Sequence, residues 1–401
     1  MSAPPLEVAD LVRSAGRAFI ERNRSWLNRL HLKVLTAIER CRTAALGGHL
    51  DECVRCGHRA ISFNSCRNRH CPKCQANARL RWLQAREREL LPTHYVHVVF
   101  TLPHELGPLT LQNKRIVFNL LFQASAATLL AIARDPRHLG AEIGFFSVLH
   151  SWNQRLEFHP HIHCVMPAGG LSADHTRWVT THPRFSLPVK ALAKVFRGKF
   201  TDALEEAFAH GKLSFHGVMK PLSRPEVFAQ LIRRTYRNTW VVYAKPPFGG
   251  PQHALRYLGR YTHRVAISNH RLISCTDDHV TFRWRDSAHK NKQRLMTLHV
   301  NEFLRRFLLH VLPPGFVRIR HFGFLSTRNR STLLPLCFRL LPVTADPAAA
   351  TTTATSLKQQ PRPSRAVWPC PHCNGEMITL ARLSAFDLRY RPPPGLHTTA
   401  A

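Results

Sequence analysis

The chain has few acidic residues and no long apolar segment. Of its 401 residues only 24 are Asp or Glu, against 57 Lys and Arg, which gives a net charge of +33 at pH 7. No apolar run approaches the roughly 18 residues of a membrane-spanning helix. The first residues, 1–7, have no basic stretch followed by an apolar core, so we expect no secretory signal. These features predict a cytoplasmic, nucleoid-associated protein with no membrane partner, whose partner is nucleic acid.

Tyrosine is also scarce, with six in the chain, yet Tyr257 and Tyr261 stand four residues apart. Residues four apart share one face of a helix, and Pro251 is well placed to begin that helix. Two phenols on one face are suited to attacking two phosphodiesters in turn. The alternative is a pair of aromatic core residues. It fits poorly with the basic residues around them, which are expected to contact DNA phosphates: Arg256, Arg260 and Arg264.

The string His159-Pro-His161-Ile-His163 predicts a metal site on a strand. Side chains alternate along a strand, so His161 and His163 point to one face and two neutral imidazoles can bind one cation. The alternative is a pair of ordinary polar residues in a chain with 26 histidines. A cation needs further ligands. We expect Gln154 as the third, with Glu157, His159 and His150 as competitors.

The cysteines are clustered in a way that predicts zinc rather than disulfides. Eleven cysteines in a reducing compartment are not expected to pair covalently. The pairs Cys53/Cys56 and Cys71/Cys74 have the spacing of a four-cysteine structural zinc site. Cys66 and His70 could replace one of these ligands or build a second site. The module is expected to present basic side chains to DNA: Arg67, Arg69 and Lys73. The pair Cys370/Cys373 is a lone half-site, either a metal knuckle or two incidental thiols.

Strand and helix patterns indicate an α+β fold with a mainly antiparallel sheet. We expect helices over 6–46, 109–134, 188–209, 225–236 and 299–311. Strands are expected over 95–103, 144–152, 162–166 and 240–245, with a hairpin of 271–274 and 280–284. The second arm of that hairpin would place Arg283 and Arg285 on a cationic face. The expected divisions are a helical segment 1–48, a zinc module 49–92, a main domain 93–342, a linker 343–368 and a cysteine-containing tail 369–401.

Several long motifs, in one order, resemble the two-tyrosine transposases of the insertion sequence ninety-one family. These motifs are residues 65–74, 158–170, 240–250, 257–268 and 318–325. The resemblance implies a His-hydrophobic-His endonuclease sheet flanked by helices, preceded by a helical and zinc-binding module. It also implies Mg²⁺ or Mn²⁺ bound by His161 and His163, and Tyr257 and Tyr261 as nucleophiles.

The resemblance implies transposition by cleavage and rejoining of single-stranded or hairpin DNA ends through 5′-phosphotyrosine intermediates. Two alternatives remain open at this stage. A zinc-dependent DNA-binding protein without catalysis would not need its tyrosines, and a metal-dependent hydrolase would need the histidines alone. The sequence leaves the oligomeric state open.

Overall fold

The computed structural model describes residues 6–181, 187–248, 259, 265–286, 289–341 and 368–391. The chain forms two compact units, each described here by itself. Unit 1 comprises residues 1–7 and 75–342, and unit 2 comprises residues 8–74 and 343–401. Helix α3 (Pro72–Glu87) begins in unit 2 and continues into unit 1. The five-part division expected from the sequence stays a prediction.

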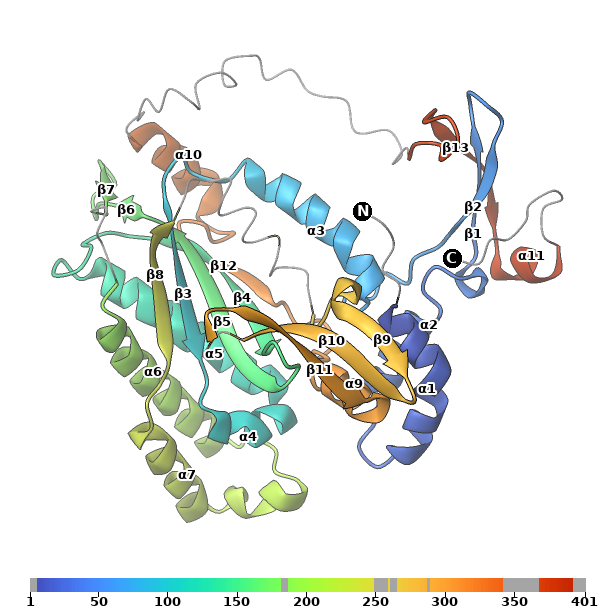
Figure 1. The fold of residues 1–401 in the computed structure, drawn as a ribbon. Coiled ribbons are helices and arrows are strands. Elements are labelled where there is room, and N and C mark those ends of the chain that lie inside the picture. Colours follow the sequence, from blue (N-terminus) through green and yellow to red (C-terminus); the bar gives the residue numbers. More distant parts are fainter. Residues whose placement is uncertain are drawn as a thin grey trace. The chain divides into compact units, whose positions relative to one another are not determined.

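The centre of unit 1 is a five-stranded antiparallel sheet, shown in Figure 1. Its strand order is β12 (Ile319–Gly323), β4 (Gly144–Trp152), β5 (Phe158–Pro167), β3 (Tyr95–Thr101) and β8 (Val242–Phe248). Strands β4 and β5 are consecutive in the chain and joined by a short turn. In this order β5 is the middle strand, paired with β4 on one side and with β3 on the other.

One face of this sheet is covered by the helices α4 (Gly107–Gln112), α5 (Lys114–Arg134), α6 (Val189–Ala209) and α7 (Pro225–Arg237) (Figure 1). The opposite face carries both an apolar cluster packed on α3 and a group of histidines. Along β5, Ile162, Cys164 and Met166 enter the core with the helices, whereas His161 and His163 point to the opposite face. The helical layer also contains the short 3₁₀ turns η2 (His104–Leu106) and η3 (Gly217–Ser223).

Helix α5 is the one described helix long and apolar enough to cross a membrane. The expectation that no apolar run approaches this length was therefore wrong. The explanation is burial: 61% of its apolar window lies inside the protein, and Val117, Phe118, Leu121 and Phe122 pack in the core of unit 1.

A second, smaller antiparallel sheet of unit 1 has the order β11 (Lys292–His299), β10 (His279–Asp286) and β9 (Leu272–Thr276). It packs on α9 (Val300–Leu309), because Val280 and Phe282 of β10 face Phe303. The remaining elements of unit 1 are the hairpin β6 (Gly169–Leu171) with β7 (Trp178–Thr180), the 3₁₀ turn η4 (Asn269–Arg271) and α10 (Arg330–Leu340).

Unit 2 combines the start of the chain with its end. It contains the helices α1 (Val8–Arg22) and α2 (Arg29–Glu39), the turn η1 (Ala44–Leu46), and the strands β1 (Gly48–Cys53) and β2 (Arg59–Phe63). From the C-terminal segment come β13 (Met377–Leu383) and α11 (Ala385–Tyr390). Strand β1 is the middle strand of the sheet, paired antiparallel to β2 on one side and β13 on the other.

Two expected helices are each divided in the structure by an asparagine. Asn28 caps the N-terminus of α2, where its side chain accepts the backbone N–H groups of Leu30 and His31, so 6–46 is not one helix. Asn113 separates α4 from α5. It is buried, has non-helical backbone angles, and exchanges two hydrogen bonds with the backbone of Ser214. Strand β5 also begins four residues earlier than expected, at Phe158.

The other expected elements are confirmed within small shifts of their ends. They are the helices α6, α7 and α9, the strands β3, β4 and β8, and the hairpin of β9 and β10. The expected linker 343–368 and the expected helix of Tyr257 and Tyr261 lie outside the described residues, apart from Trp368 and Gly259.

Candidate active site and metal centres

Three histidines meet on the face of the five-stranded sheet that also carries the buried side chains of Phe146 and Val148. His150 of β4 is the register partner of His161 of β5, and His163 follows two residues later on the same face. Their ligand nitrogens all lie within 4.8 Å of one another. The ring centroids are 5.4 Å apart for His150 and His161, 4.4 Å for His150 and His163, and 4.9 Å for His161 and His163. This geometry suits three imidazoles on one cation.

Hydrogen bonds at Nδ1 orient two of these rings. The Nδ1 atom of His161 lies 2.7 Å from the carbonyl oxygen of His159, and Nδ1 of His163 lies 2.9 Å from Nε2 of His97 on β3. In both rings Nε2 is therefore the atom placed for coordination, as is common where a second partner orients a metal-binding histidine.

Burial keeps the imidazoles of His161 and His163 neutral near pH 7. It lowers the pKa of His161 to about 4, with the nearby His159 adding to the effect. The pKa of His163 is held well below its usual range, first by burial and then by the neighbouring histidines. A neutral imidazole is the form that binds a metal.

The third side chain brought to the pair is His150 and not the favoured Gln154. Gln154 is exposed in the turn between β4 and β5, and its backbone carbonyl accepts a hydrogen bond from Arg271. Among the other competitors, Glu157 accepts hydrogen bonds from Asn153 and Arg155 within that turn. His150 lies beside the pair because β4 and β5 are antiparallel neighbours and place His150 directly opposite His161. The sequence of β5 alone does not reveal this pairing.

The turn itself is held by the second sheet and α9. The Nε2 atom of His310, just after α9, lies 3.1 Å from the Leu156 carbonyl oxygen, and its Nδ1 lies 3.2 Å from Ser151 Oγ. Arg306 donates to the Arg155 carbonyl at 3.0 Å. These contacts fix the hairpin that carries the three histidines.

The two tyrosines lie outside the described residues, as do Arg256, Arg260 and Arg264. Gly259, midway between Tyr257 and Tyr261, is described: it is helical and buried. A Cβ at this position would lie 2.8 Å from Cδ1 of Leu83 on α3. A side chain at 259 would therefore require the end of the Leu83 side chain to move.

The basic side chains expected at DNA occur in both units. Arg283 and Arg285 are exposed on one face of β10, as the alternation predicted. In unit 2, Arg67 is exposed with a left-handed backbone (φ 53°), and Arg69 and Lys73 are partly buried beside the cysteines.

The structure does not bring the expected zinc ligands Cys53, Cys56, Cys71 and Cys74 together, because the four divide between two clusters. The first cluster consists of Cys41, Cys66, Cys71 and Cys74, and the second of Cys53, Cys56, Cys370 and Cys373. The cause is the sheet of unit 2. Strand β13 lies beside β1, so it brings Cys370 and Cys373 to the pair that ends β1.

The first cluster has the geometry of a tetrahedral thiolate site. The Sγ atom of Cys74 lies 3.5 Å from that of Cys41 and 3.6 Å from that of Cys66. Sulfurs around one zinc are separated by about 3.8 Å, given Zn–S bonds of about 2.3 Å. Hydrogen bonds among the four thiols lower the pKa of Cys41 and Cys74 and raise the pKa of Cys66 and Cys71.

Sequence reasoning proposed Cys66 only as a possible ligand and missed Cys41. Cys41 follows α2 alone, without a second cysteine at knuckle spacing. The other candidate, His70, is outside the described clusters: it is buried, and its Nδ1 lies 3.1 Å from Oδ1 of Asn68.

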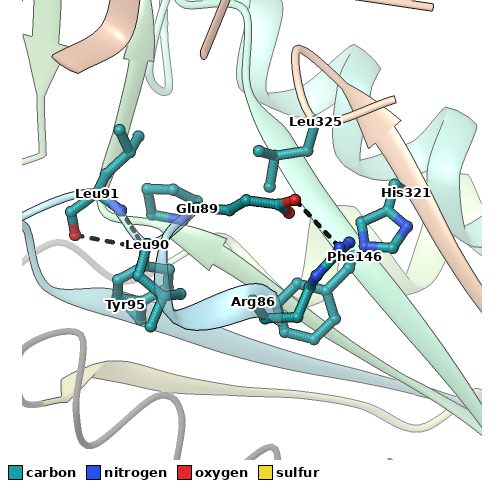
Figure 2. A pocket seen from close by; sticks show the side chains of 9 residues that line it. Arg86, Glu89, Leu90, Leu91, Tyr95, Phe146, His321 and Leu325 are labelled. Carbon is teal, nitrogen blue, oxygen red and sulfur yellow. Dashed lines mark hydrogen bonds and ion pairs between the residues drawn. The ribbon is translucent and has the colours of Figure 1, made fainter. Parts of the chain in front are cut away.

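A pocket of unit 1, drawn in Figure 2, contains none of the three histidines in its lining. It is lined by Arg86 of α3, by the residues Glu89, Leu90 and Leu91 that follow this helix, and by Tyr95, Phe146, Pro167, His321 and Leu325 from the sheet and the segments next to it. Pro167 ends β5 four residues beyond His163, roughly 13 Å along the strand. Glu89 forms ion pairs of 3.1 Å with Arg86 and 3.0 Å with Arg330. The pocket therefore marks where the end of α3 is anchored to the sheet.

Comparisons with known proteins agree over nearly the whole chain. Residues 144–332 match the family described as "Putative transposase", and residues 11–102 match "Transposase zinc-binding domain". A protein of Sinorhizobium fredii named "Putative transposase y4qJ" is 51% identical over 391 residues, covering 96% of this chain and 97% of that protein. The transposase for insertion sequence element IS801 of Pseudomonas savastanoi pv. phaseolicola is 28% identical, covering 79% of this chain and 75% of that protein.

A solved structure of the conjugative relaxase TrwC with oriT DNA, in its metal-bound form, also matches. It shares 12% identity and a TM-score of 0.22, covering 41% of this chain and 69% of that chain. A score this low does not establish a common fold.

Proposed function

The chain belongs to the insertion sequence ninety-one family of transposases, and from this membership we infer that it cuts and rejoins single-stranded DNA through 5′-phosphotyrosine intermediates. It is thus a DNA-binding enzyme that cleaves and transfers DNA strands. The observation that carries the proposed mechanism is the cluster of His150, His161 and His163 on one face of adjacent strands.

We propose that these three histidines hold Mg²⁺ or Mn²⁺. The fit rests on neutral rings, on Nδ1 hydrogen bonds that place Nε2 for coordination in His161 and His163, and on nitrogens within 4.8 Å of one another. When bound, such a cation supplies Lewis-acid polarisation of the scissile phosphate. His97, which contacts His163 and not the cation, is a positioning residue.

The proposed reaction is a transesterification in which one bond replaces another. The Oη atom of Tyr257 or Tyr261 attacks phosphorus and loses its proton to solvent, while the bond from phosphorus to the 3′-oxygen breaks. The 3′-oxygen leaves as a hydroxyl, and the 5′-phosphate stays on the tyrosine. The second tyrosine repeats this step on another strand, and attack by a free 3′-hydroxyl restores the phosphodiester and the phenol.

The zinc-binding region is proposed to hold one structural zinc at Cys41, Cys66, Cys71 and Cys74. This site presents Arg67, Arg69 and Lys73 to phosphates. The exposed Arg283 and Arg285 extend the cationic surface on unit 1. We propose that the preferred DNA is single-stranded or hairpin, and that the protein works in the cytoplasm on the nucleoid.

The proposal is tested with labelled single-stranded oligonucleotides that carry the DNA flanking the transposase gene. With Mn²⁺, the wild type should cleave and form a labelled covalent adduct on a denaturing gel. Tyr257→Phe or Tyr261→Phe alone should leave one cleavage detectable, and the double variant should lose every adduct. His161→Ala and His163→Ala should abolish cleavage but retain binding. Cleavage without an adduct would indicate a hydrolase, and binding alone a non-catalytic protein.

A further inference from the structure

The second cysteine cluster is built from two matching turns that lie more than three hundred residues apart in sequence. In the first, the N–H of Cys53 donates to the His58 carbonyl at 2.9 Å, and the N–H of Gly57 donates to the Cys53 carbonyl at 3.0 Å. In the second, Cys370 donates to the Gly375 carbonyl at 2.7 Å, and Asn374 donates to the Cys370 carbonyl at 2.9 Å.

The two turns also share their backbone angles and their bonds to sulfur. Gly57 has φ 70° and Asn374 has φ 60°, so both turns close through a left-handed residue. The N–H of Arg55 points to Sγ of Cys53 and the N–H of His372 to Sγ of Cys370, each at 3.4 Å. Backbone donors of this kind stabilise a charged sulfur. A pair of incidental thiols would have no reason to be surrounded in the same way twice.

The four sulfurs are spaced for one metal ion. The Sγ atom of Cys373 lies 3.4 Å from that of Cys53 and 3.4 Å from that of Cys56, and Cys56 lies 3.7 Å from Cys370. These separations are far longer than a disulfide bond of about 2.05 Å and close to the roughly 3.8 Å between thiolates on one zinc. We propose that Cys53, Cys56, Cys370 and Cys373 form a second structural zinc site that closes the N-terminal module with the C-terminal segment.

The cluster is closely packed where its two turns meet. A Cβ on Gly375 would lie 2.9 Å from Cβ of Arg55, 3.0 Å from Sγ of Cys53 and 3.2 Å from Sγ of Cys373, so a larger residue here would push on the two sulfurs. The rings of His58 and His372, one from each turn, stack with centroids 4.1 Å apart. Cys53 and Cys370 are buried, whereas Cys373 is partly buried and Cys56 is exposed, so one side of the site is open to solvent.

A buried carboxylate next to the site joins the same two segments. Asp51 of β1 accepts hydrogen bonds from Thr379 of β13 at 2.8 Å and from Trp368 at 3.2 Å, and from Ser62 of β2 at 2.6 Å. The segment 368–391 is thus held by a strand pairing, a buried acceptor and the proposed ion. The matched zinc-binding family ends at residue 102 and so contains neither Cys370 nor Cys373.

The consequence is that the zinc module is discontinuous, with the whole of 75–342 inserted between its two parts. Zinc binding releases the thiol protons to solvent and stabilises the closed form over the open one. Without the C-terminal part, β1 would lose one neighbouring strand, and the proposed zinc site would keep only two of its four ligands, Cys53 and Cys56. The C-terminal segment is therefore part of the folded module.

Zinc content of the full-length protein tests this site directly. The wild type should hold two zinc ions per chain, and Cys370→Ser with Cys373→Ser should hold one. Cys53→Ser with Cys56→Ser should also hold one, since each pair supplies half of the site. Cys275→Ser, at an exposed cysteine of β9, is the matched control and should keep two. One ion in the wild type, or two in the Cys370/Cys373 variant, would overturn the proposal.

A second measurement keeps all cysteines intact. A protease recognition sequence inserted after Ala350 allows the chain to be cut between the two segments. After cleavage the C-terminal fragment should co-elute with the rest of the chain in gel filtration, and a zinc chelator should release it. A fragment that separates before chelation, or that stays bound after complete zinc removal, would contradict the site. Neither readout depends on DNA cleavage, so failure here is distinct from failure of the proposed catalytic function.

Discussion

His163 owes its orientation to one neighbouring side chain. Its Nδ1 lies 2.9 Å from Nε2 of His97, and the two rings are nearly parallel, with an angle of 8° between their planes. The ring of His150 approaches from the adjacent strand. A histidine pair that appears in the sequence as a local motif is thus completed by residues from two other strands.

The identity of the third ligand gives a prediction at this scale. His150→Ala should lower the Mn²⁺-dependent cleavage rate by at least about 100-fold, because one of three imidazoles is lost. Gln154→Ala, at an exposed position of the adjoining turn, should change the rate by less than about 3-fold, because no metal ligand is lost. Cleavage rates over a Mn²⁺ titration measure both. A large loss for Gln154→Ala with a normal His150→Ala would restore the ligand set expected from the sequence.

The burial of His310 should make the folded protein less stable as the pH falls. Burial lowers its pKa to about 3 in the folded protein, whereas an unfolded histidine titrates near pH 6.5. As the pH falls below 6.5 the unfolded chain binds a proton that the folded chain does not, so the stabilisation present above pH 6.5 declines toward pH 3. The loss should be about 1.5 kcal/mol between pH 6.5 and 5.

Urea unfolding of His310→Gln, compared with the wild type at the two pH values, isolates this contribution. The variant should be less stable at neutral pH because the bonds to Ser151 and Leu156 change, but its free energy of unfolding should fall less on acidification. Equal falls in the two proteins would show that His310 does not carry this proton linkage.

At the scale of elements, the approach of Gly259 to α3 is the described contact nearest in sequence to the predicted nucleophiles. The side chains of Trp82 and Leu83 in turn pack on Tyr95, Phe146, Val148 and Val165, on the face of the sheet that also carries the histidines.

Substitution at Gly259 should therefore impair cleavage by shifting the backbone at this residue, which lies between the two predicted nucleophiles in sequence. Gly259→Ala should reduce the rate by roughly 10-fold, since small misplacements of reacting groups are costly. In a protein that already carries Leu83→Ala, adding Gly259→Ala should reduce the cleavage rate much less, because the side chain that the new methyl group would meet is gone. If Gly259→Ala reduces the cleavage rate equally with and without Leu83→Ala, contact with Leu83 does not account for the effect.

The same scale shows what the sequence can and cannot predict. Strand alternation predicted correctly that His161 and His163 share a face, and helical spacing predicted α6, α7 and α9, because these signals are local. The breaks at Asn28 and Asn113 were missed, although Asn28 has a recognisable capping position. The pairing of Cys53 with Cys373 was beyond reach, because it depends on β13 joining β1 across the intervening chain.

At the scale of the whole molecule, the charge of +33 predicts how binding responds to salt. The logarithm of the binding constant for single strands should fall linearly with the logarithm of salt concentration, because Lys and Arg displace counterions from phosphates. Arg283→Ala with Arg285→Ala should reduce that slope by about 1.4, if each side chain contacts one phosphate. Arg137→Ala removes an exposed arginine that is already ion-paired with Asp135, and serves as the control. An unchanged slope in the double variant would remove β10 from the DNA-binding surface.

The most direct test of the central claim is to identify the residue that carries the DNA. Wild-type protein is incubated with a single-stranded oligonucleotide from the element's end and Mn²⁺, digested with nuclease and protease, and analysed by mass spectrometry. The account predicts a nucleotide 5′-phosphate attached to the peptide that contains Tyr257 and Tyr261, absent when His161 is replaced by Ala. A nucleotide on any other tyrosine, on a serine, or on no residue although the DNA is cut would contradict it.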